Sequence, residues 1–454
     1  MICDYNRVDM NTVVTTVPAA RGSVVPRRGV RRAIRRRSVL AVVCILFALL
    51  LPANGQLGAA YTTWALSRAI GGQGFRLGSW EMQALGQKAR DLAEQPGANL
   101  TLAAQHDLVV SYFDAVRGIE ELGAKIEGIY ADPSVTDPRS AAAPFQAQLD
   151  ALRAEQANRR PAAERILEGQ SAVVLREAGL TTAGRILPPV SFQFTESPLY
   201  LIVSPRNRIV LEQGIYLDPS LSIARMEQIE SQVQGQLDVS ALVEGTGGFS
   251  SYPTMVIAYP NLEWVLSTIA HEWTHTYLVF RPLGWHYYDS GDTRTLNETA
   301  ASIAGDELAR LVMLRFYPDR VPPAPWPRPL SLRPGWWASV PEVQPFEFGP
   351  FMRETRLHVD ELLSEGRTAE AEGYMEARRR VLVQHGYAIR KLNQAYFAFH
   401  GSYAVGPGAT DPIGGKLRAL RQRSGSLAAF VQAVSRITSV VELNDALQRA
   451  ASRP

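Results

Sequence analysis

The sequence predicts an α+β fold that is predominantly helical, with a small mixed β-sheet beside a pair of helices that carry the candidate site. Apolar residues recur at helical spacing over much of residues 80–180. Two short β-rich runs, residues 199–203 and 209–217, surround Pro205-Arg206-Asn207 and are typical of a hairpin. A β-rich segment at residues 252–259 then precedes two helical patterns, and strands followed by helices indicate a mixed sheet packed against helices.

The first of these two helices begins after Pro260, with Asn261 as the expected N-cap and Glu263 in the first turn. Its inward stripe is formed by apolar side chains at helical spacing, from Leu262 through Leu266 and Ile269 to Trp273. His271 lies about 200° around the helix axis from Ile269. The helix is therefore expected to pack on one side and to present its histidines on the other.

The helix contains His271-Glu272-Trp273-Thr274-His275, which puts two imidazoles four residues apart on one face. This spacing is typical of a zinc site in which both histidines bind the metal and Glu272 acts as general base. The alternative is a buried helix whose histidines are hydrogen-bonded core residues. That alternative leaves the position of Glu272 unexplained, and we therefore prefer the metal site.

A catalytic zinc ion takes three protein ligands and a water molecule. Glu298 is the preferred third ligand, on a second helix predicted over residues 294–316. Small residues at Ala301, Ser302 and Gly305 follow it on the same helix face, and they would let the two helices approach closely. His286, in the loop between the helices, is the competing third ligand.

The His-Glu-x-x-His helix followed by Leu-Asn-Glu-x-x-Ala at residues 296–301 resembles the gluzincin metallopeptidases. Weaker similarity, at residues 392–397, Tyr403 and residues 417–437, is to predicted membrane-anchored bacterial aminopeptidases. The resemblance implies a gluzincin-like catalytic core with one Zn²⁺ ion bound by His271, His275 and Glu298, and Glu272 as the base. Thermolysin-like enzymes have an aspartate four residues after the third ligand, where this chain has Ser302, so the partner of His271 stays open.

Zinc would lower the pKa of its bound water to about 7. Glu272 would then accept the water proton and pass it to the leaving amine. Gluzincins often supply a tyrosine or histidine to the oxyanion from a later helix, and Tyr403 is our preferred donor, with His400 second. The alternative for Tyr403 is a half-buried aromatic without a catalytic role.

The expected substrate is a peptide or protein that adds as a strand to a sheet edge, for which residues 252–259 are the candidate. The alternative is an edge strand that binds no ligand. Glu244 is a candidate for binding a substrate's free amine, and the choice between exopeptidase and endopeptidase stays open.

The N-terminus predicts export. Residues 1–37 carry nine arginines and two aspartates and are expected to form a cytoplasmic tail. Residues 39–51 are uninterrupted apolar sequence. We therefore assign residues 38–67 to a signal anchor, with a transmembrane helix, or to a cleaved signal peptide. The catalytic part would then be membrane-anchored and extracytoplasmic, or secreted after cleavage.

The remaining chain divides into a helical N-terminal region (68–190), the metallopeptidase core (191–317), a proline- and tryptophan-rich connection expected to be non-helical (318–350) and a C-terminal helical region (351–454). The last region is expected to contain one amphipathic helix over residues 427–447. The excess positive charge is confined to the first 37 residues and the rest of the chain is net negative, so we expect no nucleic-acid partner. Both cysteines, Cys3 and Cys44, precede the predicted exported part, which would be held by its core.

These observations favour a zinc-dependent peptidase. The alternative from another class is a catalytically inactive, peptidase-like scaffold that binds peptides or cell-envelope components. The sequence leaves the oligomeric state open.

Overall fold

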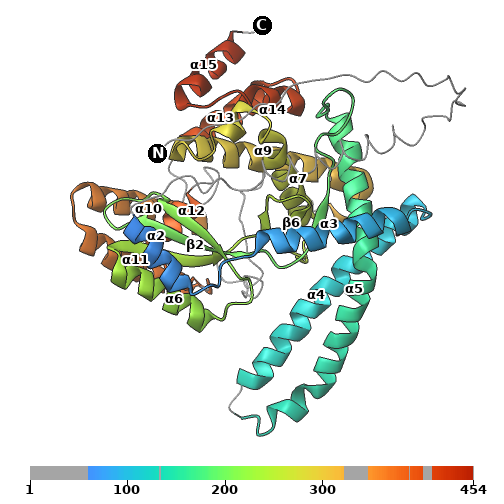
Figure 1. The fold of residues 1–454 in the computed structure, drawn as a ribbon, viewed down its shortest axis with the longest axis horizontal. Helices are drawn as coiled ribbons and strands as arrows, with labels where there is room; N and C mark the ends of the chain where they lie inside the picture. Colours follow the sequence, from blue (N-terminus) through green and yellow to red (C-terminus); the bar gives the residue numbers. More distant parts are fainter. Residues whose placement is uncertain (1–59, 132–133, 322–345, 388, 402–411, 453–454) are drawn as a thin grey trace, which may run out of the picture. The chain divides into compact units, whose positions relative to one another are not determined.

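The computed structural model describes residues 60–131, 134–321, 346–387, 389–401 and 412–452. The predicted cytoplasmic tail, residues 38–59 of the predicted signal segment, and Tyr403 lie outside these residues. The described chain is mainly helical, with two small three-stranded sheets (Figure 1). The α+β, predominantly helical prediction is therefore confirmed.

Four helices form the first part of the described chain: α2 (Ala60–Ile70), α3 (Leu77–Glu94), α4 (Leu102–Ala131) and α5 (Pro138–Glu177). Helices α4 and α5 pack along each other (Figure 1). Helix α2 packs on α6 (Ile223–Gln236), where Leu66 and Ala69 are buried. The predicted boundary at residue 67 therefore falls inside α2. Within the described ranges, no helix combines the length and the apolar composition needed to cross a membrane.

The larger sheet is antiparallel, with the order β3 (Gln213–Leu217), β2 (Leu199–Pro205), β4 (Val239–Gly245). The predicted hairpin of β2 and β3 is confirmed. Alternating side chains separate the two faces of this sheet. One face packs against α2 and α6, and the other against α10 (Phe348–Ser364), α11 (Thr368–Gln384) and α12 (Gln394–His400).

The smaller sheet is mixed, with the order β1 (Phe192–Phe194), β6 (Thr254–Val256), β5 (Gly248–Phe249). Strand β6 pairs in parallel with β1 and antiparallel with β5. The prediction of residues 252–259 as a sheet edge is therefore wrong, because β6 is the middle strand. The parallel partner β1 comes from a distant part of the chain, which local sequence does not reveal.

Helices α7 (Leu262–Leu278) and α9 (Gly291–Phe316) pack against each other in the main core, joined through the short α8 (Pro282–Trp285). Asn261 caps α7 as predicted, because its Oδ1 accepts from the Trp264 N–H at 2.9 Å. Gly305 of α9 lies directly over α7: a Cβ there would be 2.8 Å from the Ser267 carbonyl oxygen and 3.1 Å from the His271 Cβ. The small face predicted for α9 thus allows the close helix contact.

The C-terminal part differs from the prediction in two places. The short 3-10 helix η1 (Pro318–Arg320) and the start of α10 lie inside the connection that we expected to be non-helical, whose residues 322–345 are outside the described chain. The single helix predicted over residues 427–447 is wrong as well. After α13 (Ile413–Arg423) the chain forms two helices, α14 (Leu427–Val434) and α15 (Val440–Ala451). Ser439 starts α15, since its Oγ accepts from the Glu442 N–H at 3.2 Å.

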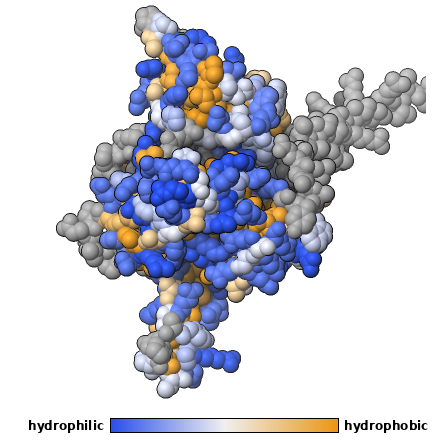
Figure 2. All heavy atoms as spheres, turned by 90° about the vertical axis from the view of Figure 1, so that its left-hand side faces the viewer, coloured by the Kyte–Doolittle hydropathy of each residue, from blue (hydrophilic) through white to orange (hydrophobic). Residues whose placement is uncertain are grey.

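Figure 2 shows the face at the left of Figure 1, where hydrophilic residues predominate and apolar residues form separate areas. One of these areas lies at the upper end of the view, over the C-terminal helices (Figures 1 and 2).

Candidate metal centre

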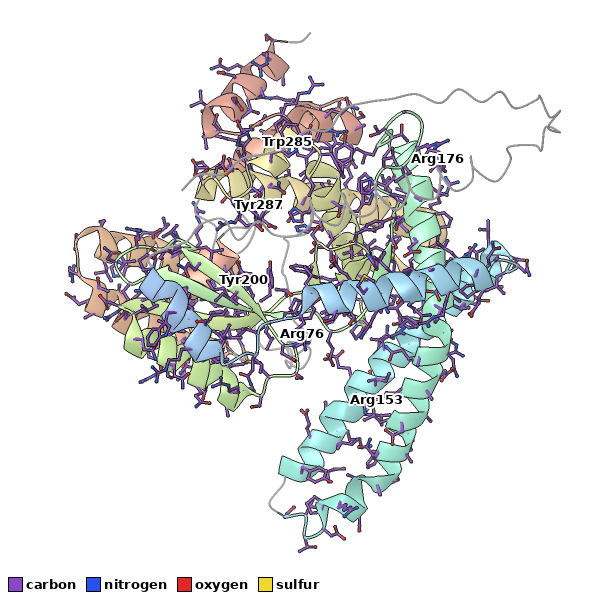
Figure 3. All side chains as sticks on the ribbon, in the orientation of Figure 1. Arg76, Arg153, Arg176, Tyr200, Trp285 and Tyr287 are labelled. Atoms are coloured by element: carbon purple, nitrogen blue, oxygen red, sulfur yellow. The ribbon has the colours of Figure 1, made fainter. Side chains whose placement is uncertain are left out.

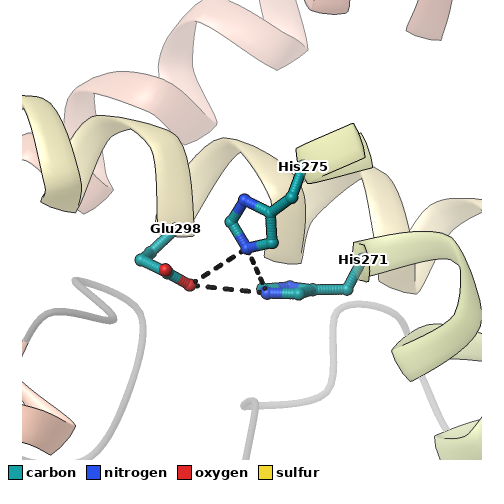
Figure 4. A group of neighbouring side chains, drawn as sticks. All are labelled: His271, His275 and Glu298. Carbon is teal, nitrogen blue, oxygen red and sulfur yellow. Dashed lines mark hydrogen bonds and ion pairs between the residues drawn. The ribbon is translucent and has the colours of Figure 1, made fainter. Parts of the chain in front are cut away.

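Three predicted ligands, His271, His275 and Glu298, lie together at the contact of α7 and α9 (Figure 4). The two imidazole Nε2 atoms are 2.9 Å apart. The Oε2 atom of Glu298 lies 3.4 Å from Nε2 of His271 and 3.3 Å from Nε2 of His275. The side chains are 13%, 12% and 9% exposed, respectively, so the cluster is largely buried and keeps some access to solvent.

The donor atoms fit a zinc ion in type and spacing. Tetrahedral ligands about 2.1 Å from zinc are roughly 3.4 Å from each other, close to the two nitrogen–oxygen distances. The two imidazole nitrogens are closer than this and would separate by roughly 0.5 Å. Oε2 of Glu298 is buried and has no hydrogen-bond partner within the described residues. Its only polar contacts among the described residues are the two long ones to the imidazole nitrogens, so a cation between these atoms would stabilise the buried oxygen.

The partner of His275 fixes which of its nitrogens faces the cluster. The Nδ1–H group of His275 donates to Oδ1 of Asn297 at 2.7 Å. The Asn297 amide donates through Nδ2 to the Leu283 carbonyl at 3.4 Å, which orients its oxygen toward the histidine. Nε2 of His275 is then the nitrogen that faces the cluster, and an imidazole held in this way by its other nitrogen is the usual arrangement of a metal ligand.

For His271, Ser302 provides a partner, because its Oγ lies 3.3 Å from Nδ1. The sequence left this partner open. Asp306, one turn further along α9, accepts a hydrogen bond from the Ser267 hydroxyl at 2.6 Å. Burial raises the pKa of Asp306 to about 6, although this hydrogen bond and His271 act to lower it. The residue that contacts His271 is thus Ser302, at the position where thermolysin-like enzymes have an aspartate.

Glu298 is oriented by Tyr287, from the loop between α8 and α9. The Tyr287 hydroxyl donates to Oε1 of Glu298 at 2.5 Å, which leaves Oε2 facing the histidines. Burial alone would raise the pKa of Glu298, but His275 and His271 hold it well below its usual value. Glu298 is therefore ionised, as a metal ligand must be.

We expect the Tyr287→Phe substitution to weaken zinc binding about 10- to 100-fold, the usual effect of losing a hydrogen-bond partner of a metal ligand. The ring would keep its packing, while Oε1 of Glu298 would lose its donor. Competition with a chromogenic zinc chelator measures the change. Tyr288→Phe is the matched control, because the Tyr288 side chain is 63% exposed, and it should keep the wild-type affinity. Equal affinities for the two variants would contradict an orienting role of Tyr287.

Glu272 lies on α7 beside the ligands and is buried. Burial raises its pKa, although the two histidines act to lower it. A Cβ on Gly248 would lie 2.9 Å from Oε1 of Glu272, so the backbone of β5 runs directly beside this carboxylate. Glycine at this position makes the close approach of strand and carboxylate possible.

Strand β5 is the outer strand of its sheet within the described chain. The Ile257 N–H donates to the Gly247 carbonyl at 3.3 Å. Because neighbouring residues in an antiparallel pair point their N–H and C=O groups in opposite directions, those of Gly248 point away from β6. The sheet edge beside Glu272 is therefore Gly248, and not the segment predicted from sequence.

The other candidate residues are not grouped with the three ligands or lie outside the described chain. His286 is exposed and its Nδ1 lies 2.6 Å from Asp289, so it is not grouped with the three ligands. His400 of α12 packs against Tyr396, with ring centroids 4.2 Å apart, and burial lowers its pKa to about 4. Glu244 of β4 lies opposite Tyr200 of β2 in the sheet, and burial raises the pKa of Glu244 to about 7.

Sequence reasoning assigned no role to Asn297 or Tyr287. Asn297 directly precedes Glu298, so its place beside a ligand was a usable signal. Tyr287 depends on the path of the connecting loop, and no local pattern indicated its bond to Glu298.

Comparisons with protein-family models, with curated proteins and with solved structures give no match for this chain.

Proposed function

We propose that this protein is a zinc-dependent peptidase of the gluzincin type, in which Glu272 is the general base. The observation that carries the proposal is the buried Oε2 of Glu298, which lies 3.3–3.4 Å from two imidazole nitrogens and has no hydrogen-bond partner in the described residues. His271, His275 and Glu298 would hold one zinc ion. The bound ion would polarise the carbonyl of the scissile bond and lower the pKa of a water molecule.

The residues of the chain divide the remaining work. Glu272 is buried beside the ligands and has a raised pKa, which makes it a stronger base than an exposed glutamate. It would accept the proton of the attacking water and donate it to the leaving amine. The outward N–H and C=O groups of Gly248 offer hydrogen bonds to the main chain of an extended peptide beside Glu272. A peptide is therefore the expected substrate.

The proposed location is the extracytoplasmic side of a membrane, with the N-terminal segment as a signal anchor; release after signal cleavage is the alternative. The support is the sequence alone: arginines concentrated in residues 1–37 and the apolar run at residues 39–51.

We expect the purified full chain to hydrolyse peptides from a digest of unfolded protein, detected by mass spectrometry. Treatment with a chelator should abolish the cleavage, and one equivalent of zinc should restore it, because the water must be activated by the metal. A protein that binds one zinc and cleaves no peptide would instead be the inactive scaffold. Cleavage that persists in the metal-free protein would contradict a zinc mechanism.

A further inference from the structure

Arg294 lies at the border of the metal centre. It is on α9, four residues before Glu298, and therefore on the same helix face. Its guanidinium carbon is 5.8 Å from the centre of the Tyr287 ring, the ring whose hydroxyl binds Glu298. The Arg294 side chain is partly buried. The positive charge is thus held next to the cluster, one helical turn from a metal ligand.

This charge has no carboxylate partner within the described ranges. Two other partly buried arginines are paired with carboxylates: Arg206 binds Glu372 through two nitrogens, and Arg390 binds Glu230 in the same way. Arg225 and Arg281 also lack a carboxylate partner among the described residues, but they donate hydrogen bonds to neutral oxygens. Arg310, on the same helix as Arg294, lies 4.0 Å from Glu263. The nearby carboxylate of Glu298 is engaged by Tyr287 and the two histidines and makes no ion pair with Arg294. An anion supplied from outside would therefore stabilise the partly desolvated guanidinium.

Arg294 has tyrosines among its neighbours: it faces the ring of Tyr287 and acts electrostatically on Tyr200 and Tyr288. Figure 3 labels two of them, Tyr287 from the loop before α9 and Tyr200 from β2. Burial raises the pKa of Tyr200 to about 12, although the charge of Arg294 acts in the opposite direction. These phenols are therefore neutral at physiological pH and do not neutralise the arginine. Its planar fork matches a carboxylate, which it binds through two parallel hydrogen bonds.

The spacing along α9 indicates where such a carboxylate would be. Four helical residues rise about 6 Å, and consecutive Cα atoms of a peptide are about 3.8 Å apart. A carboxylate on the residue next to the scissile bond could therefore reach Arg294 while the scissile carbonyl is at the metal. Resting on the proposed peptidase function, we propose that Arg294 binds a substrate carboxylate on that residue and makes the protein selective for it.

Two sources of this carboxylate are distinguished by three sets of N-acetylated tripeptides. The peptides of the first set have alanine, leucine or phenylalanine as the last residue, with a free C-terminal carboxylate. The second set contains the same peptides as C-terminal amides. The third is a set of amides with glutamate at each position in turn. Faster cleavage of the acids assigns the carboxylate to the C-terminus, and faster cleavage of the glutamate amides assigns it to a side chain. Equal cleavage of all three sets overturns the proposal.

The Arg294→Gln substitution should lower kcat/KM for the preferred set about 10- to 100-fold, the worth of a hydrogen bond to a charged group. It should lower kcat/KM for the neutral amides less, so that the ratio between the two sets falls, and Arg294→Lys should keep part of the preference. Arg310→Gln is the matched control, because it removes an equal charge from the same helix, and it should keep the full preference. An unchanged preference in Arg294→Gln overturns the proposal.

Binding separates this proposal from the peptidase function. The same peptides are titrated calorimetrically into zinc-loaded Glu272→Gln protein, with and without Arg294→Gln. Tighter binding of carboxylate peptides that depends on Arg294 supports the proposal even if no peptide is cleaved, in which case only the peptidase function fails. Equal binding of acids and amides, together with measured cleavage, rejects the role of Arg294 and leaves the peptidase function intact.

Discussion

The Glu272→Gln variant should bind one zinc ion and lose most of its peptide hydrolysis, by about 10²- to 10⁴-fold in kcat. The amide keeps the size of the side chain but cannot accept the proton of the attacking water. Because Glu272 lies beside the three ligands and is not one of them, the metal site should stay intact. Initial rates on the cleaved peptide, with zinc content measured on the same sample, test both halves of the expectation.

The matched control is Glu263→Gln, which makes the same change on the first turn of α7, away from the ligand cluster. It should retain both zinc and activity. Wild-type rates in the Glu272→Gln variant would remove this residue from the mechanism. Loss of zinc in that variant would instead mean that Glu272 supports the metal site directly.

Replacement of His271 or His275 by alanine, or of Glu298 by glutamine, should weaken zinc binding by more than the roughly 10- to 100-fold loss expected when only a partner of a ligand is removed. Each change removes one of three donor atoms that lie within 4.8 Å of one another. Zinc affinity measured by chelator competition, with circular dichroism to verify folding, gives the comparison.

His286→Ala is the matched control for the histidine variants, and it also tests the competing third ligand. His286 is bound to Asp289 and exposed, so this variant should bind zinc as tightly as the wild type. If His286→Ala loses zinc while Glu298→Gln keeps it, the assignment of the third ligand to Glu298 is wrong.

The local features of the site could be predicted from the sequence. Asn261 and the apolar stripe define α7 because a helix cap and a helical period depend only on residues within a few turns. Glu298 could be paired with the histidines because small residues on its helix face indicate close packing. The close approach at Gly305 is the physical basis of that pairing.

What could not be predicted depends on contacts between distant segments. The pairing of β1 with β6 removes β6 from the sheet edge, and no signal near residues 252–259 indicates it. The bond between Tyr287 and Glu298 depends on how the loop after α8 folds back. The break before α15 is different, because Ser439 and Glu442 have the spacing of a helix start and this local signal stands inside a continuous apolar period.

A crystal structure of the zinc-loaded chain, with the metal located by anomalous scattering at the zinc absorption edge, tests the proposed zinc site most directly. The expected result is one zinc position, within about 2.2 Å of Nε2 of His271, Nε2 of His275 and Oε2 of Glu298. A zinc ion bound at another position, or no zinc at these three atoms under saturating conditions, would contradict it.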